Sequence, residues 1–446
     1  MSVWWRPRAP VRIKTNAASV QFALFTFLQS VINLGDSFAG VIIRTEDCKT
    51  YLGVKRHMKR CVKLAALVAA LCATMAFAQV PSTEAGAQSQ FSTSPVAYVY
   101  VSSALSRTRS DIYAYSAAAD GALTPVLGSP FPGNAAYMAL NGRFLFGNDS
   151  TDTYIYSFRI APDGALQQVS SIDASKYNPG NTGGPGNLFL DHTGTTLYDG
   201  DIYAYGTGSN AYQFFTIDNS TGQLNYLGVT PNGGPGVDSV LSFIGNNVYA
   251  YSSSCYHFTP AIYGYKRNSN QTLSPLNINP SIPVGPNGDT YCPYLAAADP
   301  TNHVAVSLEP YSGYAAAGPP QLAVYTANSS GNLTTTSTSA NMPKTAVTSV
   351  TDMWMSPSGK LLAVAGSTGL QVFHFNGASP ITPYTGLLTK NQVDQMWWDN
   401  ANHLYALSRS AGKLYVFTVT PTSVSQAPGS PHTIANPQNV IILPKM

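Results

Sequence analysis

Charged residues are scarce in this chain: Lys, Arg, Asp and Glu make up 10% of its 446 residues, against roughly 25% in an ordinary soluble protein. The basic residues are also unevenly placed, because 11 of the 24 lie before residue 79, with only three of the 21 acidic ones. The rest of the chain is therefore net acidic. It has no concentrated basic face, which excludes nucleic acid as a partner.

Several catalytic signatures are missing as well. The sequence contains no Gly-x-Ser-x-Gly elbow, no zinc-ligand spacing and no phosphate-binding loop. Glutamate occurs only twice beyond residue 78, at Glu84 and Glu309, so a rich metal cage is not expected and no cofactor is predicted. What the chain has instead is 37 Gly, 31 Pro and 27 Tyr, a composition that suits short strands joined by tight turns.

Residues 58–78 read as a secretory signal peptide. Met-Lys-Arg-Cys-Val-Lys is followed by a short apolar run and by Ala-Phe-Ala, which predicts cleavage after Ala78 and export to the periplasm or beyond. The apolar run is too short to span a membrane comfortably, and we expect no membrane span in the mature chain. A buried helix is the alternative interpretation of this run.

Residues 1–57 stand upstream of a signal that normally opens a chain. We interpret them as an over-extended start before Met58. The alternative makes Val20 to Ile43 a first membrane segment, although Gln29, Asn33 and Asp36 interrupt it. Residues 79–94 are predicted to be a linker.

The remaining residues, 95–446, contain an internal repeat. An alternating apolar and aromatic strand recurs seven times, beginning at Ile112, Ile155, Gln213, Ile262, Leu322, Leu370 and Leu414. Several copies run into a glycine turn, such as Asp-Gly-Ala-Leu at 120–123 and 163–166. A second signature, strand, turn and strand, lies between the copies. Each unit therefore supplies four strands, as one propeller blade does in roughly 40–50 residues.

The two ends of this region complement each other. Asn439-Val-Ile-Ile-Leu-Pro is an inner strand with no second strand after it, and Ala97-Tyr-Val-Tyr-Val is a second strand with no inner strand before it. Joined, they complete one blade and remove the unpaired sheet edges. We therefore predict an all-β, seven-bladed propeller of four-stranded antiparallel blades. A sandwich with a second β domain, or an open solenoid, would not explain the ends.

At these residues the chain resembles the lactonase-like, 6-phosphogluconolactonase-type propellers. The resemblance rests on the Tyr-Val-Tyr-Val opening, the Asp-Gly-Ala-Leu-Thr-Pro turn and Gly128-Ser-Pro-Phe-Pro-Gly, and it covers about residues 95–446. It implies a face of His, Arg and Glu side chains that holds an acidic substrate. Here Gly-Pro-Gly stands at 184–186 and 234–236, where that face would need a histidine.

In such a ring, the loops before inner strands and those between second and third strands share one face, where ligands usually bind. The loops assigned to this face are rich in Tyr, Asn and Gly. The candidate ligand-face residues are Arg107, Arg109, Tyr177, Asp238, His257, Tyr291, Glu309, Asp352, Asp394 and Arg409. Cys255 and Cys292 fall on two of these loops, and an exported pair predicts a disulfide; two independent thiols are the alternative.

Three aspartates, Asp238, Asp352 and Asp394, precede their inner strands by similar spacing and would face the channel together. Their oxygens would suit Ca²⁺, although strand capping or solvation is the favoured interpretation and no metal site is assigned. We expect His192, His303 and His403 to be solvated turn residues on the opposite face. Trp354, Trp397 and Trp398 are expected in the core between blades.

Three function classes remain open. The favoured one is an exported, monomeric binding or scaffold propeller that recognises a glycan, peptide or protein through its Tyr-rich loops. The second is a lactonase-like hydrolase with a degenerate or altered site, and the third a purely structural protein of the cell envelope. Whether the chain is an enzyme stays open, because propellers carry many unrelated functions.

Overall fold

In this computed structural model the described residues are 94–106, 109–149, 153–177, 186–200, 211–231 and 240–445. All of them belong to one compact unit, 91–446. The signal peptide predicted at 58–78, the preceding segment and most of the linker lie outside the described residues, as do Arg107 and Asp238. No helix among the described residues is long and apolar enough to span a membrane.

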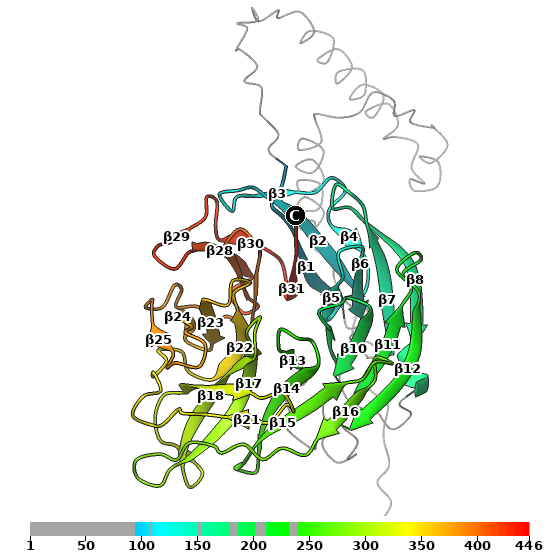
Figure 1. Ribbon diagram of the computed structural model, residues 1–446. Helices are drawn as coiled ribbons and strands as arrows, with labels where there is room; N and C mark the ends of the chain where they lie inside the picture. Colours follow the sequence, from blue (N-terminus) through cyan, green and yellow to red (C-terminus); the bar gives the residue numbers. More distant parts are fainter. Residues whose placement is uncertain are drawn as a thin grey trace, which may run out of the picture. The chain divides into compact units, whose positions relative to one another are not determined.

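The described residues form seven antiparallel sheets of four main strands each, arranged as the blades of a propeller (Figure 1). Blade 1 holds β1 (Ala97–Ser106), β2 (Arg109–Ala117), β3 (Leu123–Pro125), the accessory β4 (Phe131–Pro132) and β31 (Pro437–Pro444). Blade 2 holds β5 (Met138–Leu140), β6 (Phe144–Asn148), β7 (Tyr154–Ile160) and β8 (Leu166–Asp173), followed by the 3₁₀ turn η2 (Ala174–Tyr177). Blade 3 holds β9 (Asn187–Leu190), β10 (Thr196–Gly200), β11 (Ala211–Ile217) and β12 (Leu224–Pro231).

Blades 4 to 7 repeat the arrangement. Blade 4 holds β13 (Ser242–Phe243), β14 (Tyr249–Tyr256), β15 (Thr259–Arg267) and β16 (Leu273–Leu276); blade 5 holds β17 (Thr290–Ala298), β18 (His303–Ser312), β19 (Ala315–Ala316), β20 (Gln321–Ala327) and β21 (Leu333–Thr334). Blade 6 holds β22 (Val350–Met355), β23 (Leu361–Gly366), β24 (Gly369–His374) and β25 (Thr382–Pro383). Blade 7 holds β26 (Gln395–Trp398), β27 (His403–Ser408), β28 (Lys413–Val419), β29 (Val424–Gln426) and β30 (His432–Thr433).

The ring closes within blade 1, as predicted. β31 pairs antiparallel with β1, with Ala97 opposite Pro444 and Val101 opposite Val440. The last strand is therefore the inner strand of the blade that the first strands began, and both termini of the described chain lie together in Figure 1.

Apolar side chains fill the spaces between neighbouring blades. Second strands are buried on both faces, so they read as almost continuous apolar runs, for example Leu361 to Gly366. One cluster joins Leu407 and Val416 of blade 7 to Val99 and Val440 of blade 1. Each blade thus packs on its two neighbours rather than on one shared core.

The recurring glycine turns have a physical cause in this packing. Gly164 has φ of +88°, and a Cβ there would lie 2.5 Å from the ring of Tyr98 in blade 1. Tyr100 donates a hydrogen bond from its hydroxyl to the Gly164 carbonyl at 3.0 Å. The same bond joins Tyr251 of blade 4 to Gly331 of blade 5 at 2.8 Å. Only glycine tolerates both the backbone conformation and the close contact with the adjacent blade.

Candidate functional site

A cavity of about 710 Å³ lies at the centre of the ring and is lined by residues from all seven inner strands. The end of this channel at which the inner strands begin is called the mouth here. Since it gathers one segment from every blade and combines apolar walls with a few polar groups, it is the best-formed candidate ligand site among the described residues.

Corresponding positions of the inner strands line this channel at two levels. The pairing with the second strands matches Asp352 with Ala365 and Trp354 with Ala363, and blades 1, 3 and 7 follow the same register. The level nearer the mouth, the mouth ring, consists of Tyr137, Asn187, Val240, Leu295, Asp352, Gln395 and Asn439. The next level, the middle ring, consists of Ala139, Phe189, Ser242, Ala297, Trp354, Trp397 and Ile441.

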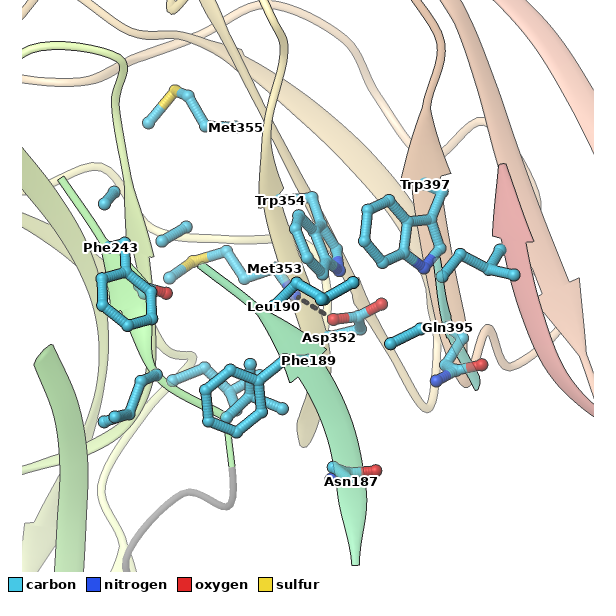
Figure 2. Close-up of a pocket in the computed structure, with 18 of the residues that line it drawn as sticks. Asn187, Phe189, Leu190, Phe243, Asp352, Met353, Trp354, Met355, Gln395 and Trp397 are labelled. Carbon is cyan, nitrogen blue, oxygen red and sulfur yellow. Dashed lines mark hydrogen bonds between the residues drawn. The ribbon is translucent and has the colours of Figure 1, made fainter. Parts of the chain in front are cut away.

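Two indole rings dominate one wall of the channel. Trp354 of blade 6 and Trp397 of blade 7 lie with their ring centroids 4.1 Å apart and their planes tilted by 32°, side by side in Figure 2. Both are half-buried and both line the cavity. The expectation that they lie in the core between blades was therefore incomplete. It holds for Trp398, which is 5% exposed and donates from Nε1 to the carbonyl of Trp354 at 3.3 Å.

Polar side chains of the mouth ring connect neighbouring blades. Asp352 accepts hydrogen bonds from Met353 N at 2.9 Å, drawn in Figure 2, and from Met396 N of blade 7 at 2.6 Å. Gln395 in turn accepts a bond from Val440 N of blade 1 at 3.0 Å. These bonds fix the positions of the carboxylate and the amide beside the indole pair. The wall is therefore preorganised rather than adaptable.

A carboxylate and a guanidinium extend this polar edge. Asp394 accepts bonds from Gln392 Nε2 and from Arg409 N, both at 2.7 Å. Arg409 donates from Nε to the carbonyl of Gln438 at 2.7 Å and forms no ion pair with any described residue. Both side chains line the cavity, so a hydrogen-bond donor and an acceptor of opposite charge face the same space.

A histidine, rather than the indole pair, stands at the far end of the channel. His192 lines it there as an exposed turn residue, as expected, with its ring 6.2 Å from that of Phe243. The expectation of a solvated turn was wrong for His403, which is 0% exposed and bonded through Nδ1 to Asp399. His303 makes the same bond to Asp299 at 2.9 Å and is half-buried. The next blade covers both rings, because His403 packs on Gly121 and His303 on Gly377.

The structure therefore brings together three of the predicted ligand-face residues, Asp352, Asp394 and Arg409. The other candidates that the structure describes do not line the channel: Arg109, Tyr177, His257, Tyr291 and Glu309. Tyr177 stacks on Tyr226 with ring centroids 4.1 Å apart, and Arg109 is exposed at the start of β2. The alternative of a calcium site on three aspartates stays untested, since Asp238 is outside the described residues. Within the described ranges no group of three or more His, Cys, Asp or Glu could hold a metal ion.

Most other channel residues were not predicted, among them Asn187, Phe189, Gln395 and Asn439. Asn439 is 3% exposed, and its Oδ1 accepts no hydrogen bond from the described residues. A signal for them was present in the sequence. Each stands at a fixed distance before the turn that joins its inner strand to the second strand, or at the matching place in the closing strand. Aligning the seven units on that turn would have found them.

Three residues at the rim of blades 4 and 5 also differ from their expected settings. Cys255 in β14 and Cys292 in β17 form the predicted disulfide, with Cα atoms 5.2 Å apart, and both lie in strands rather than loops. Tyr291 is 2% exposed and bonds through its hydroxyl to Gln321, so it supports the rim from beneath.

Comparisons with known proteins agree with this architecture. No protein-family model matches the chain, and no curated protein matches its sequence. Solved structures do match. The putative 6-phosphogluconolactonase from Bacteroides uniformis superposes with a TM-score of 0.56 at 16% identity, over 78% of this chain and 99% of its own. The chain has the fold of the lactonase-like propellers.

Two further lactonase-like structures give the same result. The Pseudomonas aeruginosa periplasmic gluconolactonase PpgL superposes with a TM-score of 0.55 at 14% identity, over 78% of this chain and 99% of its own. A putative 6-phosphogluconolactonase from Bacteroides fragilis superposes with 0.56 at 15% identity, over 82% and 100%. At such identities the shared feature is the fold, and the chemistry of this propeller depends on the residues of its own channel.

Proposed function

We propose that this propeller binds a sugar ring or a sugar lactone in the mouth of its central channel. The observation that carries the proposal is the indole pair, Trp354 and Trp397, held next to fixed hydrogen-bonding groups on Asp352 and Gln395. A sugar has an apolar face of C–H groups and an edge of hydroxyls. An aromatic wall with amide and carboxylate groups at its edge matches both.

The hydrogen bonds that Asp352 and Asp394 already accept favour binding over hydrolysis. Asp394 already accepts two hydrogen bonds through its two oxygens, and Asp352 accepts two backbone N–H groups. Both carboxylates are therefore held in place by protein donors, which suits hydrogen bonding to a ligand better than proton transfer from water. The favoured role is therefore that of a binding propeller, with the site in the channel rather than on the Tyr-rich loops alone.

Tryptophan fluorescence tests the proposal directly. Of the five tryptophans, only Trp354, Trp397 and Trp398 lie beyond residue 78, so the emission of the mature chain reports on this wall. Titration with glucose, gluconate and glucono-δ-lactone is expected to change the emission with saturation. No change with any of these probes would count against a sugar site.

Trp354→Ala is expected to weaken sugar binding by about 30-fold, equivalent to about 2 kcal/mol, because it removes half of the stacking wall at the centre of the site. Calorimetric titration of the variant measures this loss. Tyr154→Ala is the matched control, since Tyr154 is an exposed aromatic residue of blade 2 that does not line the channel. Equal affinities for the wild type and Trp354→Ala would contradict the proposal.

Lactone hydrolysis is the second candidate, favoured by the presence of Asp394 and Arg409 on one channel wall. In this role Asp394 would remove a proton from the attacking water, and Arg409 would stabilise the negative charge that develops on the lactone oxygen. If so, the protein will open glucono-δ-lactone faster than buffer in a pH-stat, and Arg409→Met will lower kcat/KM by about 100-fold. A wild-type rate equal to that of buffer would exclude this role for this substrate.

A further inference from the structure

Blades 4 and 5 rise above the mouth of the channel. β17 begins at Thr290, well before its mouth-ring residue Leu295, whereas β26 begins at its own mouth-ring residue, Gln395. β14, β15 and β18 lengthen at the same end. The raised part carries six aromatic side chains, here called the aromatic ridge: Tyr256, His257, Phe258, Tyr294, Tyr311 and Tyr314.

The side chains of the ridge hold one another in place. Phe258 meets Tyr311 and Tyr314 edge to face, with ring centroids 5.0 Å apart in both pairs. The hydroxyls of Tyr294 and Tyr311 are 3.0 Å apart. Burial, that hydrogen bond and the nearby Glu309 carboxylate raise the pKa of Tyr311. Tyr314 is 87% exposed, so the ridge presents an aromatic surface to solvent.

The hairpin turn of the ridge does not have the residues that such turns prefer. His257 and Phe258 form the two-residue turn between β14 and β15, with φ of +49° and +59°. Such turns favour Asn-Gly, because side chains beyond Cβ are disfavoured at positive φ. The disulfide between Cys255 and Cys292 joins this hairpin to β17. The turn therefore holds the rings of His257 and Phe258 in a backbone conformation that local preference disfavours.

The ridge adjoins the channel site in the chain and in the order of the blades. Tyr294 directly precedes Leu295 of the mouth ring, and blade 5 is the neighbour of blade 6, which carries Trp354. The segments 249–260, 290–298 and 304–317 contain no Lys or Arg, so the ridge does not favour an anionic ligand. A neutral ligand with apolar faces and hydroxyl edges fits both surfaces.

We propose that the aromatic ridge is a second subsite for the ligand of the channel, so that the natural ligand is a neutral oligosaccharide or polysaccharide rather than a single sugar. This inference rests on the proposed sugar site in the channel. One ring of the chain stacks on Trp354 and Trp397, and following rings lie over Tyr294 and Tyr314. Affinity must then increase with chain length.

The test compares glucose with cello-, laminari- and chito-oligosaccharides from the disaccharide to the hexasaccharide, by calorimetry on the full chain. At least one series is expected to bind about ten-fold or more tightly as its length increases. The triple variant His257→Asn, Phe258→Gly, Tyr314→Ala should lose that gain in affinity while keeping the wild-type affinity for the monosaccharide. Because Asn-Gly suits the turn, the first two substitutions should preserve the hairpin although the ring contacts of Phe258 are lost.

Each outcome separates the two proposals. If no sugar of any length binds, the channel proposal fails and the ridge proposal fails with it. If the monosaccharide binds and no series gains affinity with length, only the ridge proposal is overturned. The same holds if the gain with length persists in the ridge variant. Tyr154→Ala, the control on blade 2, should bind every probe as the wild type does.

Discussion

Replacing Asp399 with alanine is expected to lower the free energy of unfolding by about 3–5 kcal/mol. Asp399 and His403 are both fully buried. The carboxylate accepts bonds from Ala401 N and His403 N at 2.8 Å, from His403 Nδ1 at 2.7 Å and from the Tyr405 hydroxyl at 3.0 Å. Its removal leaves these donors buried without an acceptor. Thermal unfolding should show a melting temperature lower by roughly 4–7 °C for a unit of this size.

The equivalent turn of blade 5 supplies the matched control. Asp299 bonds His303 in the same way, but the histidine side chain is 17% exposed there and 0% in blade 7. Water can replace part of the hydrogen bonding that Asp299→Ala removes. The decrease in the free energy of unfolding should therefore be about half as large as for Asp399→Ala. Equal losses for the two variants would mean that burial does not set the strength of the pair. Glucose binding at the mouth should be the same in both variants at low temperature.

Removing the disulfide is expected to have an effect of similar size. Cys255 and Cys292 are separated by 37 positions, and opening a loop of that length lowers the free energy of unfolding by about 4 kcal/mol in the chain-entropy account. The variant Cys255→Ser, Cys292→Ser should therefore melt about 5 °C lower than the wild type. A reductant should lower the wild-type melting temperature to that of the variant and leave the variant unchanged.

The same protein sample tests whether the chain is exported. We propose that the chain is exported, because Cys255 and Cys292 are bonded to each other and disulfides persist in oxidising compartments. Intact mass, measured before and after reduction and alkylation, should show a product that begins at Gln79 with both cysteines protected until reduction. A product that retains residues 1–57 and has two free thiols would contradict export.

The fold could be predicted from the sequence because its signals are local and repeated. The alternating strand at Ile112 recurs in every blade, and the Asp-Gly-Ala-Leu turns repeat the glycine that packing against the neighbouring blade requires. The complementary ends, Ala97 to Val101 and Asn439 to Pro444, indicated the closure that β1 and β31 make. The disulfide was predictable because residues 79–446 contain only two cysteines.

The site was harder to predict because it is assembled from seven short strands that are distant in sequence. Trp354 and Trp398 stand in similar apolar contexts, and they differ only in their distance from the following turn, a spacing that becomes visible once the seven units are aligned. His403 looks like a turn residue in the sequence, and its burial is decided by Gly121 of another blade. Interactions of this kind leave no local pattern.

The two rings of the channel have a consequence for how such a protein can evolve. Every position in the mouth ring and the middle ring is supplied by a separate blade, and each blade is stabilised by its own strand pairing and by its neighbours. A substitution at one of these positions alters one side of the ligand's surroundings while six others stay as they were. Ligand preference can therefore change through substitutions in one blade at a time while the ring stays intact. This holds even between chains whose sequences have otherwise diverged almost completely.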